Sequence, residues 1–354
     1  MIPVIDMHCD TIAVIYSARH RDIFEKDVPD ILRSEGEPEL RNNSLMLDLE
    51  RMKKAGYMGQ CFALFSDLEM LRRKGISPYG YACALSDLFD EQMEDNADLI
   101  CPVTSGTEME KNFAKGRMSA LKTIEEGGAF EGSLTKLEDM YKRGVRKATL
   151  TWNYENELAY PNPSAYDSRQ NTYSCTGFDT VNGLKKKGFE FVTAMEAMGM
   201  IIDISHLNDA GIRDIFNTVK PSTPVVASHS DARGICGHPR NLSDDMLRAI
   251  AEHGGVAGLN YAPSFLSEEN RKNGGQKSRI SDMIRQLKYM KNVAGIDSIG
   301  LGSDFDGIGG DLELSGVQDL PKLADAMSLS GFSTEEIEKV FYKNVLRVYK
   351  DVLG

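Results

Sequence analysis

Three histidines of this chain occur where a metal site could be built. The first lies in His8-Cys9-Asp10, and the other two, His206 and His229, each end a short apolar run. Side chains two residues apart on a β-strand point to the same face, so the His8 imidazole and the Asp10 carboxylate could bind one cation. The chain has 6 histidines, and half of them occupy this kind of position. Imidazole with carboxylate is a typical ligand set for transition-metal ions, so this pattern predicts a metal site.

A carboxylate that could join two metal ions lies between these histidines in the sequence. Glu125-Glu126-Gly127-Gly128 ends another β-prone run. Adjacent residues of a strand point to opposite faces, so only one of the two glutamates can serve. The full set has too many ligands for one tetrahedral zinc ion with an open position, but it suits two metal ions that share a carboxylate and activate a water.

The elements that must position these residues alternate along the chain. The expected strands cover residues 4–10, 58–65, 120–126, 148–152, 201–205, 225–228, 256–260 and 299–303. The helical segments between them cover residues 45–55, 79–98, 133–143, 183–198, 209–217, 243–252 and 280–294. Strands that alternate with helices predict a parallel sheet, and eight such units favour a closed (β/α)8 TIM barrel over an open sheet. We therefore expect a single catalytic domain over residues 1–354.

Polar residues gather at the carboxyl ends of the expected strands. They are His8, Asp10, Glu126, Trp152, His206, His229, Asn260 and Asp304. In a barrel these ends meet at one mouth, which is the face on which barrel enzymes build their sites. The longest irregular stretch, residues 153–179, is expected to cover this mouth because loops of such length are commonly lids or binding loops.

Composition excludes several classes of protein and partner. The 354 residues are 41% hydrophobic, which is typical of a globular protein with a large core. A net charge of -12 argues against nucleic-acid or anionic-membrane partners. The 6 cysteines contain no Cys-x-x-Cys pair, so we expect no disulfide framework and a reducing compartment. No signal peptide, apolar span or lipid-anchor motif is recognisable, which predicts a cytoplasmic protein without a membrane anchor.

Several segments together resemble the membrane (renal) dipeptidase family, peptidase family M19. They are His8-Cys9-Asp10, Glu126-Gly127-Gly128, Asp203-Ile204-Ser205-His206, Ser228-His229-Ser230, Arg240-Asn241 and Gly302-Ser303-Asp304-Phe305-Asp306-Gly307. Their order and spacing match over nearly the whole chain, which makes the resemblance more specific than any one motif. The family is similar to the amidohydrolases. The resemblance implies a (β/α)8 barrel with two zinc ions per chain that hydrolyses small dipeptides, and it implies a homodimer.

The resemblance also implies roles for individual residues. One zinc ion would be held by His8 and Asp10, a second by His206 and His229, and Glu126 would bridge both and support catalysis. Asp304 would take a proton from the attacking water and pass it to the departing amine. Arg240 would grip the free carboxylate of the substrate with its planar guanidinium group.

One position departs from the family pattern. The family has a histidine at the end of the fourth strand, where this chain has its only tryptophan, Trp152, followed by Asn153. An indole nitrogen can donate a hydrogen bond but cannot accept a proton. Trp152 either packs in the loop or, with Asn153, contacts the substrate carbonyl. Asn260 and Tyr261 end the seventh strand and are expected to line the pocket, although a strand-end Asn is also a common turn former.

The sequence thus predicts a zinc-dependent dipeptidase, whose sites could also take other divalent transition metals. Asp6 could orient a ligand imidazole, or it could be a hydrogen-bonded core residue. Two other functions stay open. One is a related binuclear metal amidohydrolase that acts on N-acyl amino acids or lactams. The other is a catalytically silent barrel that retains its metal and binds a small ligand or a partner protein.

Overall fold

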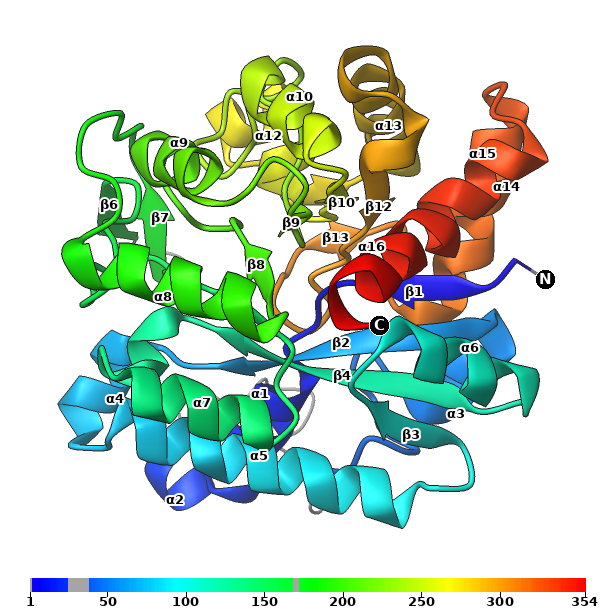
Figure 1. Ribbon diagram of the computed structural model, residues 1–354. Helices are drawn as coiled ribbons and strands as arrows, with labels where there is room; N and C mark the ends of the chain where they lie inside the picture. Colours follow the sequence, from blue (N-terminus) through cyan, green and yellow to red (C-terminus); the bar gives the residue numbers. More distant parts are fainter. Residues whose placement is uncertain (1, 25–37, 168–171) are drawn as a thin grey trace.

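A closed ring of eight parallel strands forms the centre of the computed structural model, which describes residues 2–24, 38–167 and 172–354 (Figure 1). The strands are β1 (Val4–Asp6), β2 (Tyr57–Phe65), β4 (Met118–Glu125), β5 (Lys147–Thr149), β8 (Ile201–Asp203), β9 (Val225–Ala227), β10 (Val256–Leu259) and β12 (Ile299–Leu301). They pair in that order, and β12 closes the ring on β1. The predicted (β/α)8 TIM barrel is therefore confirmed, with each expected strand in place.

Every ring strand except β2 ends earlier than the sequence pattern predicted. β1 ends at Asp6 and β8 at Asp203, so His8, Asp10 and His206 lie in the loops that follow these strands. A parallel strand, β3 (Ile100–Val103), was not predicted; it pairs with the first half of β4 outside the ring. β3 contains Pro102, and proline within a strand is restricted to sheet edges because it has no amide hydrogen.

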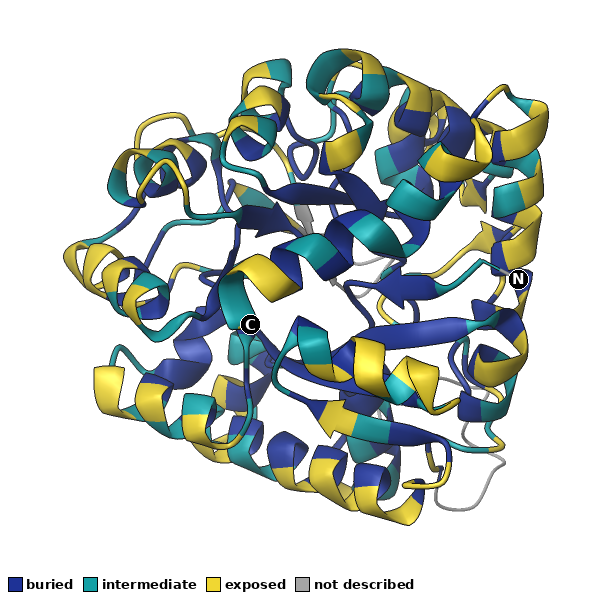
Figure 2. Cartoon of the chain, turned by 45° about the vertical axis from the view of Figure 1, so that its right-hand side comes forward, coloured by how far each residue is buried: buried dark blue, intermediate teal, exposed yellow. Residues whose placement is uncertain are grey.

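Helices surround the ring, with their buried faces turned inward and their exposed faces outward (Figure 2). The seven expected helical segments correspond to α3 (Leu49–Ala55), α5 (Pro78–Asp95), α7 (Leu134–Lys142), α8 (Lys186–Met198), α9 (Asp209–Thr218), α10 (Asp244–Glu252) and α13 (Ile280–Ala294). The further helices are α1 (Thr11–Arg19), α2 (Arg21–Phe24), α4 (Leu68–Lys74), α6 (Gly106–Ala114), α11 (Pro263–Leu266), α12 (Glu268–Asn273), α14 (Leu320–Leu329), α15 (Thr334–Glu338) and α16 (Asn344–Leu353). Short turns of other helix types are η3 (Gly127–Phe130), η4 (Ile296–Ser298), η5 (Val317–Asp319) and η6 (Lys339–Lys343). Most of these helices pack their buried faces on the outside of the ring and do not cover its two ends.

The C-terminal helix α16 closes one of these ends. Its Val345 and Tyr349 belong to one buried cluster with Ile5, Leu121 and Val226, which lie inside the ring. This end receives the amino termini of the strands, and Figure 1 shows α16 lying across it. Function must therefore be sought at the opposite end, where the strands finish.

The expected lid segment, residues 153–179, contains a small antiparallel hairpin of β6 (Ser164–Asp167) and β7 (Thr172–Cys175). Residues 168–171 of this segment lie outside the described part of the chain. A second small pair joins β11 (Lys277–Ser278) to β13 (Asp311–Leu312). All 6 cysteines are free. Within the described residues, no helix has the length and apolar character needed to cross a membrane.

Candidate metal centre

The carboxyl ends of five strands deliver ionisable side chains to one point inside the barrel mouth. His8 and Asp10 follow β1, His206 follows β8, His229 follows β9 and Asp304 follows β12. Glu125 is the last residue of β4. All of these side chains except that of Asp304 are buried. The barrel closure thus brings together residues that are almost 300 positions apart in the sequence.

Glu125 lies between two groups of ligands. Its Oε2 atom is 3.2 Å from His8 Nε2, which also lies 3.6 Å from Asp10 Oδ2 and 3.9 Å from Asp304 Oδ1. Its Oε1 atom is 3.0 Å from His206 Nε2 and 3.7 Å from His229 Nε2. One oxygen therefore faces each group, which is the geometry that a bridging carboxylate requires.

The structure corrects the choice between the two adjacent glutamates. The family resemblance implies the bridging and catalytic role for Glu126, but the Glu126 carboxylate points away from the histidines. It accepts hydrogen bonds from the backbone N–H groups of Gly128 at 2.7 Å and Trp152 at 2.8 Å. Residues of β4 alternate between the barrel interior and the helix layer, with Leu121 in the interior cluster. The same alternation turns Glu125 inward.

The local contacts of the centre are those of a site that can hold cations. Nε2 of His8 and Oδ1 of Asp10 are buried and have no hydrogen-bond partner among the described residues. Nε2 of His206 and Nε2 of His229 lie only 2.9 Å apart. A Cβ on Gly307 would lie 2.0 Å from Asp10 Oδ2 and 2.6 Å from Asp304 Oδ1, so glycine leaves these carboxylates room. Ligand atoms without hydrogen-bond partners and crowded lone pairs fit a site that binds metal ions.

Burial sets the protonation of these groups. Burial, with the nearby charges of Arg240 and His8, holds the pKa values of His206 and His229 well below their usual range. Although burial opposes it, the carboxylates of Glu125 and Asp10 hold the pKa of His8 well above its usual range. Asn153 Oδ1 lies 3.3 Å from His206 Nδ1, and a hydrogen on Nδ1 leaves the Nε2 lone pair directed at the centre.

The pKa values of two carboxyl groups of the centre are raised. Burial and the charge of Glu125 raise the pKa of Asp10 to about 6. Burial raises the pKa of Asp304 to about 7, and Asp10 and Glu125 add to this effect. Clustered carboxylates that resist ionisation are typical of a site that a cation neutralises.

Buried aspartates hold the strand ends that carry the ligands. Asp6 Oδ1 accepts hydrogen bonds from the N–H groups of His8 at 3.1 Å and Ser303 at 3.0 Å, so it joins β1 to β12. Asp203 Oδ1 accepts from the N–H groups of Ser205 and Ser228 and joins β8 to β9 in the same way. Asp6 therefore fixes the backbone of a candidate ligand, and of the two roles left open for it the structure shows that of a hydrogen-bonded core residue.

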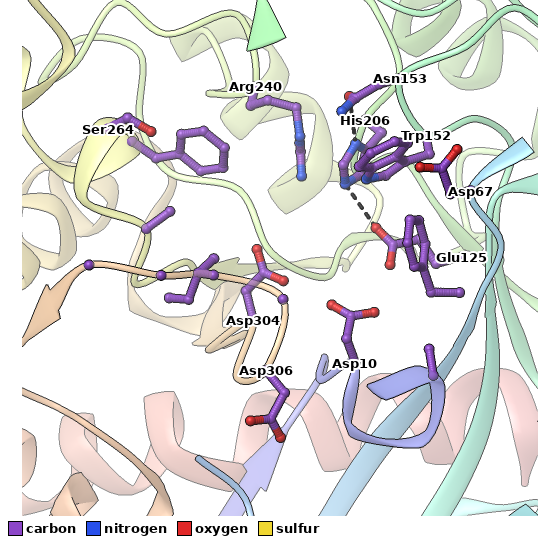
Figure 3. A pocket seen from close by; sticks show the side chains of 18 of the residues that line it. Asp10, Asp67, Glu125, Trp152, Asn153, His206, Arg240, Ser264, Asp304 and Asp306 are labelled. Atoms are coloured by element: carbon purple, nitrogen blue, oxygen red, sulfur yellow. Dashed lines mark hydrogen bonds and ion pairs between the residues drawn. The ribbon is translucent and has the colours of Figure 1, made fainter. Parts of the chain in front are cut away.

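Beside the centre lies a cavity of about 630 Å³. Its walls include Asp10, Glu125, His206 and Asp304 from the centre, together with Arg240, Trp152 and Asn153. Figure 3 shows Arg240 facing Asp304 and Asp10 across this space. Aromatic and apolar side chains that the sequence analysis did not single out complete the walls: Phe65, Met70, Tyr81 and Phe265. The cavity is large enough for a small organic substrate.

Arg240 is 6% exposed, and its guanidinium group makes only long contacts of 3.4 Å to Ser230 Oγ and to the His229 carbonyl oxygen. Its Nε atom has no hydrogen-bond partner among the described residues. The guanidinium group lies over the ring of Phe265, 5.5 Å from its centroid. A buried guanidinium with free donors in a cavity wall is suited to bind an anionic group of a ligand.

Two residues that were expected to line the pocket lie beneath it. Asn260 is fully buried and donates from Nδ2 to Asp304 Oδ2 at 2.9 Å, so it holds Asp304 in place. Tyr261 is fully buried and packs edge-on against Phe305. Asp306 is occupied as well, because it accepts hydrogen bonds from Thr11 Oγ1 and the Met46 N–H. The expectation that Asn260 and Tyr261 line the pocket is therefore not met, because both side chains are buried and neither is among the residues of the cavity wall.

Trp152 forms part of the cavity wall beside His206. Its ring packs edge-on between Phe65, at 4.9 Å between centroids, and Tyr154, at 5.4 Å. Its centroid is 6.1 Å from that of His206. The ring is thus packed in the loop, as one of the two alternatives has it, and it also borders the cavity.

Comparison with known proteins agrees with this geometry. The sequence profile described as "Membrane dipeptidase (Peptidase family M19)" matches residues 1–353. The dipeptidase aclJ of Aspergillus oryzae is 32% identical over 269 residues, which are 75% of this chain and 60% of that protein.

Two solved structures share the fold over the full length. A dipeptidase of metallopeptidase family M19 superposes with a TM-score of 0.81 at 25% identity, covering 100% of this chain and 99% of the other. A metallopeptidase from Rhodobacter sphaeroides, bound to a phosphinate mimic of L-Ala-D-Ala, gives 0.81 at 24% identity, with 99% of each chain covered. By its profile match over nearly every residue, the chain belongs to the membrane dipeptidase family, peptidase family M19.

Proposed function

We propose that this protein is a zinc-dependent dipeptidase that hydrolyses the peptide bond of small dipeptides. The observation that carries the proposal is the placement of Glu125, whose two carboxylate oxygens face separate histidines at the edge of a cavity. That cavity also holds Arg240, a buried cation with unused donors. Metal ligands on one side and a carboxylate receptor on the other match a substrate whose scissile bond lies close to a free C-terminus.

Five side chains would hold the metal ions. His8 and Asp10 form one half of the centre, His206 and His229 form the other half, and Glu125 contacts both. When bound, a pair of divalent cations polarises a carbonyl group and lowers the pKa of water to near neutrality. The low pKa values of His206 and His229 leave both imidazoles neutral at pH 7, as metal ligation requires.

Asp304 is the proposed proton carrier. It borders the cavity, lies 3.9 Å from His8 and is held by the Asn260 side chain. Its carboxylate can take a proton from the attacking water because it lies between the centre and the cavity. The proton would pass to the leaving nitrogen, so that the products are two free amino acids.

Arg240 and Trp152 would orient the substrate. The guanidinium group of Arg240 would bind the terminal carboxylate in a two-point contact. The backbone N–H of Trp152 is already bonded to Glu126, so the indole N–H is the donor that remains for the substrate. A cytoplasmic location is part of the proposal, and the free cysteines support it.

Hydrolysis assays with purified protein test this function. Protein prepared without chelators is assayed for metal content and for hydrolysis of a panel of dipeptides, N-acetyl amino acids and lactams. We expect about two metal ions per chain and activity on dipeptides that a chelator abolishes. Activity on N-acyl amino acids or lactams alone would reject the dipeptidase assignment in favour of a related amidohydrolase. Metal binding without any hydrolysis would support a silent barrel.

A further inference from the structure

The glutamate next to the bridging carboxylate occupies an unusual backbone conformation. Glu126 has φ +86° and ψ +95°, in the region of positive φ that glycine tolerates and other residues avoid. Its side chain is fully buried. A strained, buried, ionisable residue persists only where surrounding contacts over-determine it, and such residues concentrate at functional sites.

Two of the three groups that contact the Glu126 carboxylate lie in the loop that follows β5. Its Oε1 accepts from the Gly128 N–H and makes a close contact with Asn156 Nδ2, while Oε2 accepts from the Trp152 N–H. Asn156 Nδ2 also donates to the Leu150 carbonyl oxygen at 2.8 Å. One buried carboxylate therefore holds the segment 150–156, through the Trp152 N–H and through the Asn156 side chain.

The tied segment carries two residues that reach the centre. Trp152 forms the cavity wall, and Asn153 Oδ1 lies 3.3 Å from His206 Nδ1. The opposite nitrogen of the same ring lies 3.0 Å from Glu125 Oε1. Figure 3 shows this path from Asn153 through His206 to Glu125. A partner on the outer ring nitrogen fixes both the rotation and the tautomer of an imidazole ligand.

We propose that Glu126 is a positioning residue of the centre: its carboxylate holds the segment 150–156 so that Asn153 orients His206 and Trp152 forms the cavity wall. The two adjacent glutamates then divide the work, because Glu125 faces the histidines and Glu126 holds the loop that aligns one of them. The part of the proposal that concerns catalysis rests on the proposed function. The part that concerns the loop does not.

The only tryptophan of the chain makes the loop directly observable. Glu126→Gly removes the carboxylate and also relieves the positive φ, so this variant keeps a backbone that can fold. Glu131→Gly is the matched control, since Glu131 also has a positive φ, of 49°, but contacts Ser77 and Lys136 away from the cavity. We expect Glu126→Gly, but not Glu131→Gly, to shift Trp152 emission to longer wavelength and to increase quenching by acrylamide in metal-free protein.

Activity and metal binding test the link to His206. Loss of a residue that orients a metal ligand typically reduces metal affinity or activity by about 10- to 100-fold. We expect this loss of kcat/KM for Glu126→Gly and for Asn153→Ala, and no further loss when the two are combined, because both act on His206. Glu126→Gln, which keeps the volume but offers an N–H group to one of the backbone donors, should show a loss in the same direction.

The possible failures are distinguishable. Unchanged Trp152 fluorescence in Glu126→Gly would overturn the loop assignment, whatever the enzyme does. Changed fluorescence with full activity, or additive losses in the double variant, would overturn the link to His206. A wild-type protein that hydrolyses no dipeptide, together with the expected fluorescence change, would reject the proposed function and leave the loop assignment standing.

Discussion

Replacing Arg240 with methionine should abolish recognition of the substrate's C-terminal carboxylate. The guanidinium group is 6% exposed and has unused donors, so a bound carboxylate would form a largely desolvated, charge-assisted pair with it. Methionine has a similar length and no charge, and it would leave the substrate carboxylate buried without a partner. We therefore predict that kcat/KM falls for dipeptides. For substrates that lack this carboxylate, kcat/KM should not change.

The size of the loss follows from the burial of the site. Truncating one partner of a buried, hydrogen-bonded charge pair costs about 2–5 kcal/mol. Since each ~1.4 kcal/mol changes a rate tenfold, kcat/KM should fall by about 30-fold to about 5000-fold. Arg240→Lys keeps the charge but loses the two-point contact, so its loss should be smaller than that of the methionine variant.

The assay compares a dipeptide with its C-terminal amide in the wild type and in each variant. The wild type should prefer the dipeptide by about the factor that Arg240→Met loses, and Arg240→Met should show almost no preference. Comparing both substrates in both proteins separates the carboxylate contact from general damage to the site. If Arg240→Met keeps the wild-type preference for the free carboxylate, Arg240 is not the receptor and the orientation of substrate proposed above is wrong.

Three further predictions concern the metal centre. Glu125→Gln should reduce bound metal from about two ions per chain to one or fewer, whereas Glu126→Gln should lose less metal in the same elemental analysis; the reverse pattern would make Glu126 the bridging carboxylate. Burial and neighbouring charge raise the pKa of Asp10 to about 6, and burial raises that of Glu126 to about 7, so metal-free folded protein retains protons that the unfolded chain releases. Its stability should therefore fall as pH rises from about 4 to about 7, and the gain in Tm on adding zinc should be larger at pH 8 than at pH 5; an equal gain would contradict the linkage. Gly307→Ala should impair activity because its Cβ would lie 2.0 Å from Asp10 Oδ2, while Gly309→Ala, with open space around it, should be neutral in the same hydrolysis assay.

The barrel could be predicted from the sequence because its evidence is local. Each strand of a parallel barrel is a short apolar run, and each is followed by a helix with its own boundary signals. α3, for example, begins where Asp48 accepts from the Arg51 N–H and ends at Gly56, which has a left-handed conformation. The strand ends were less well predicted, because His8 and His206 continue apolar runs although their backbones have already left the sheet.

The choice between Glu125 and Glu126 could not be made from the sequence pattern. Every residue of β4 is buried, because one face packs in the barrel and the other under the helices, so no alternation of polar and apolar residues reveals which side is inward. The register of β4 against its neighbours would have supplied the answer, since Leu121 and Glu125 share a face. The strained backbone of Glu126 was also invisible, because a glycine is the usual signal for such a conformation and here it follows one residue later.

The sequence by itself determined the kinds of side chain available and the end of the barrel at which they gather. His8, Asp10, His206, His229 and Asp304 each follow a strand in the primary structure, and a closed parallel barrel leaves such residues one place to meet. Only the tertiary structure decided which neighbours they face. Closure of the ring turned Glu125 inward and Glu126 toward the loop after β5, and it placed Asn260 beneath Asp304. These contacts join residues far apart in the chain, so their geometry depends on strand register and side-chain packing that no local pattern encodes.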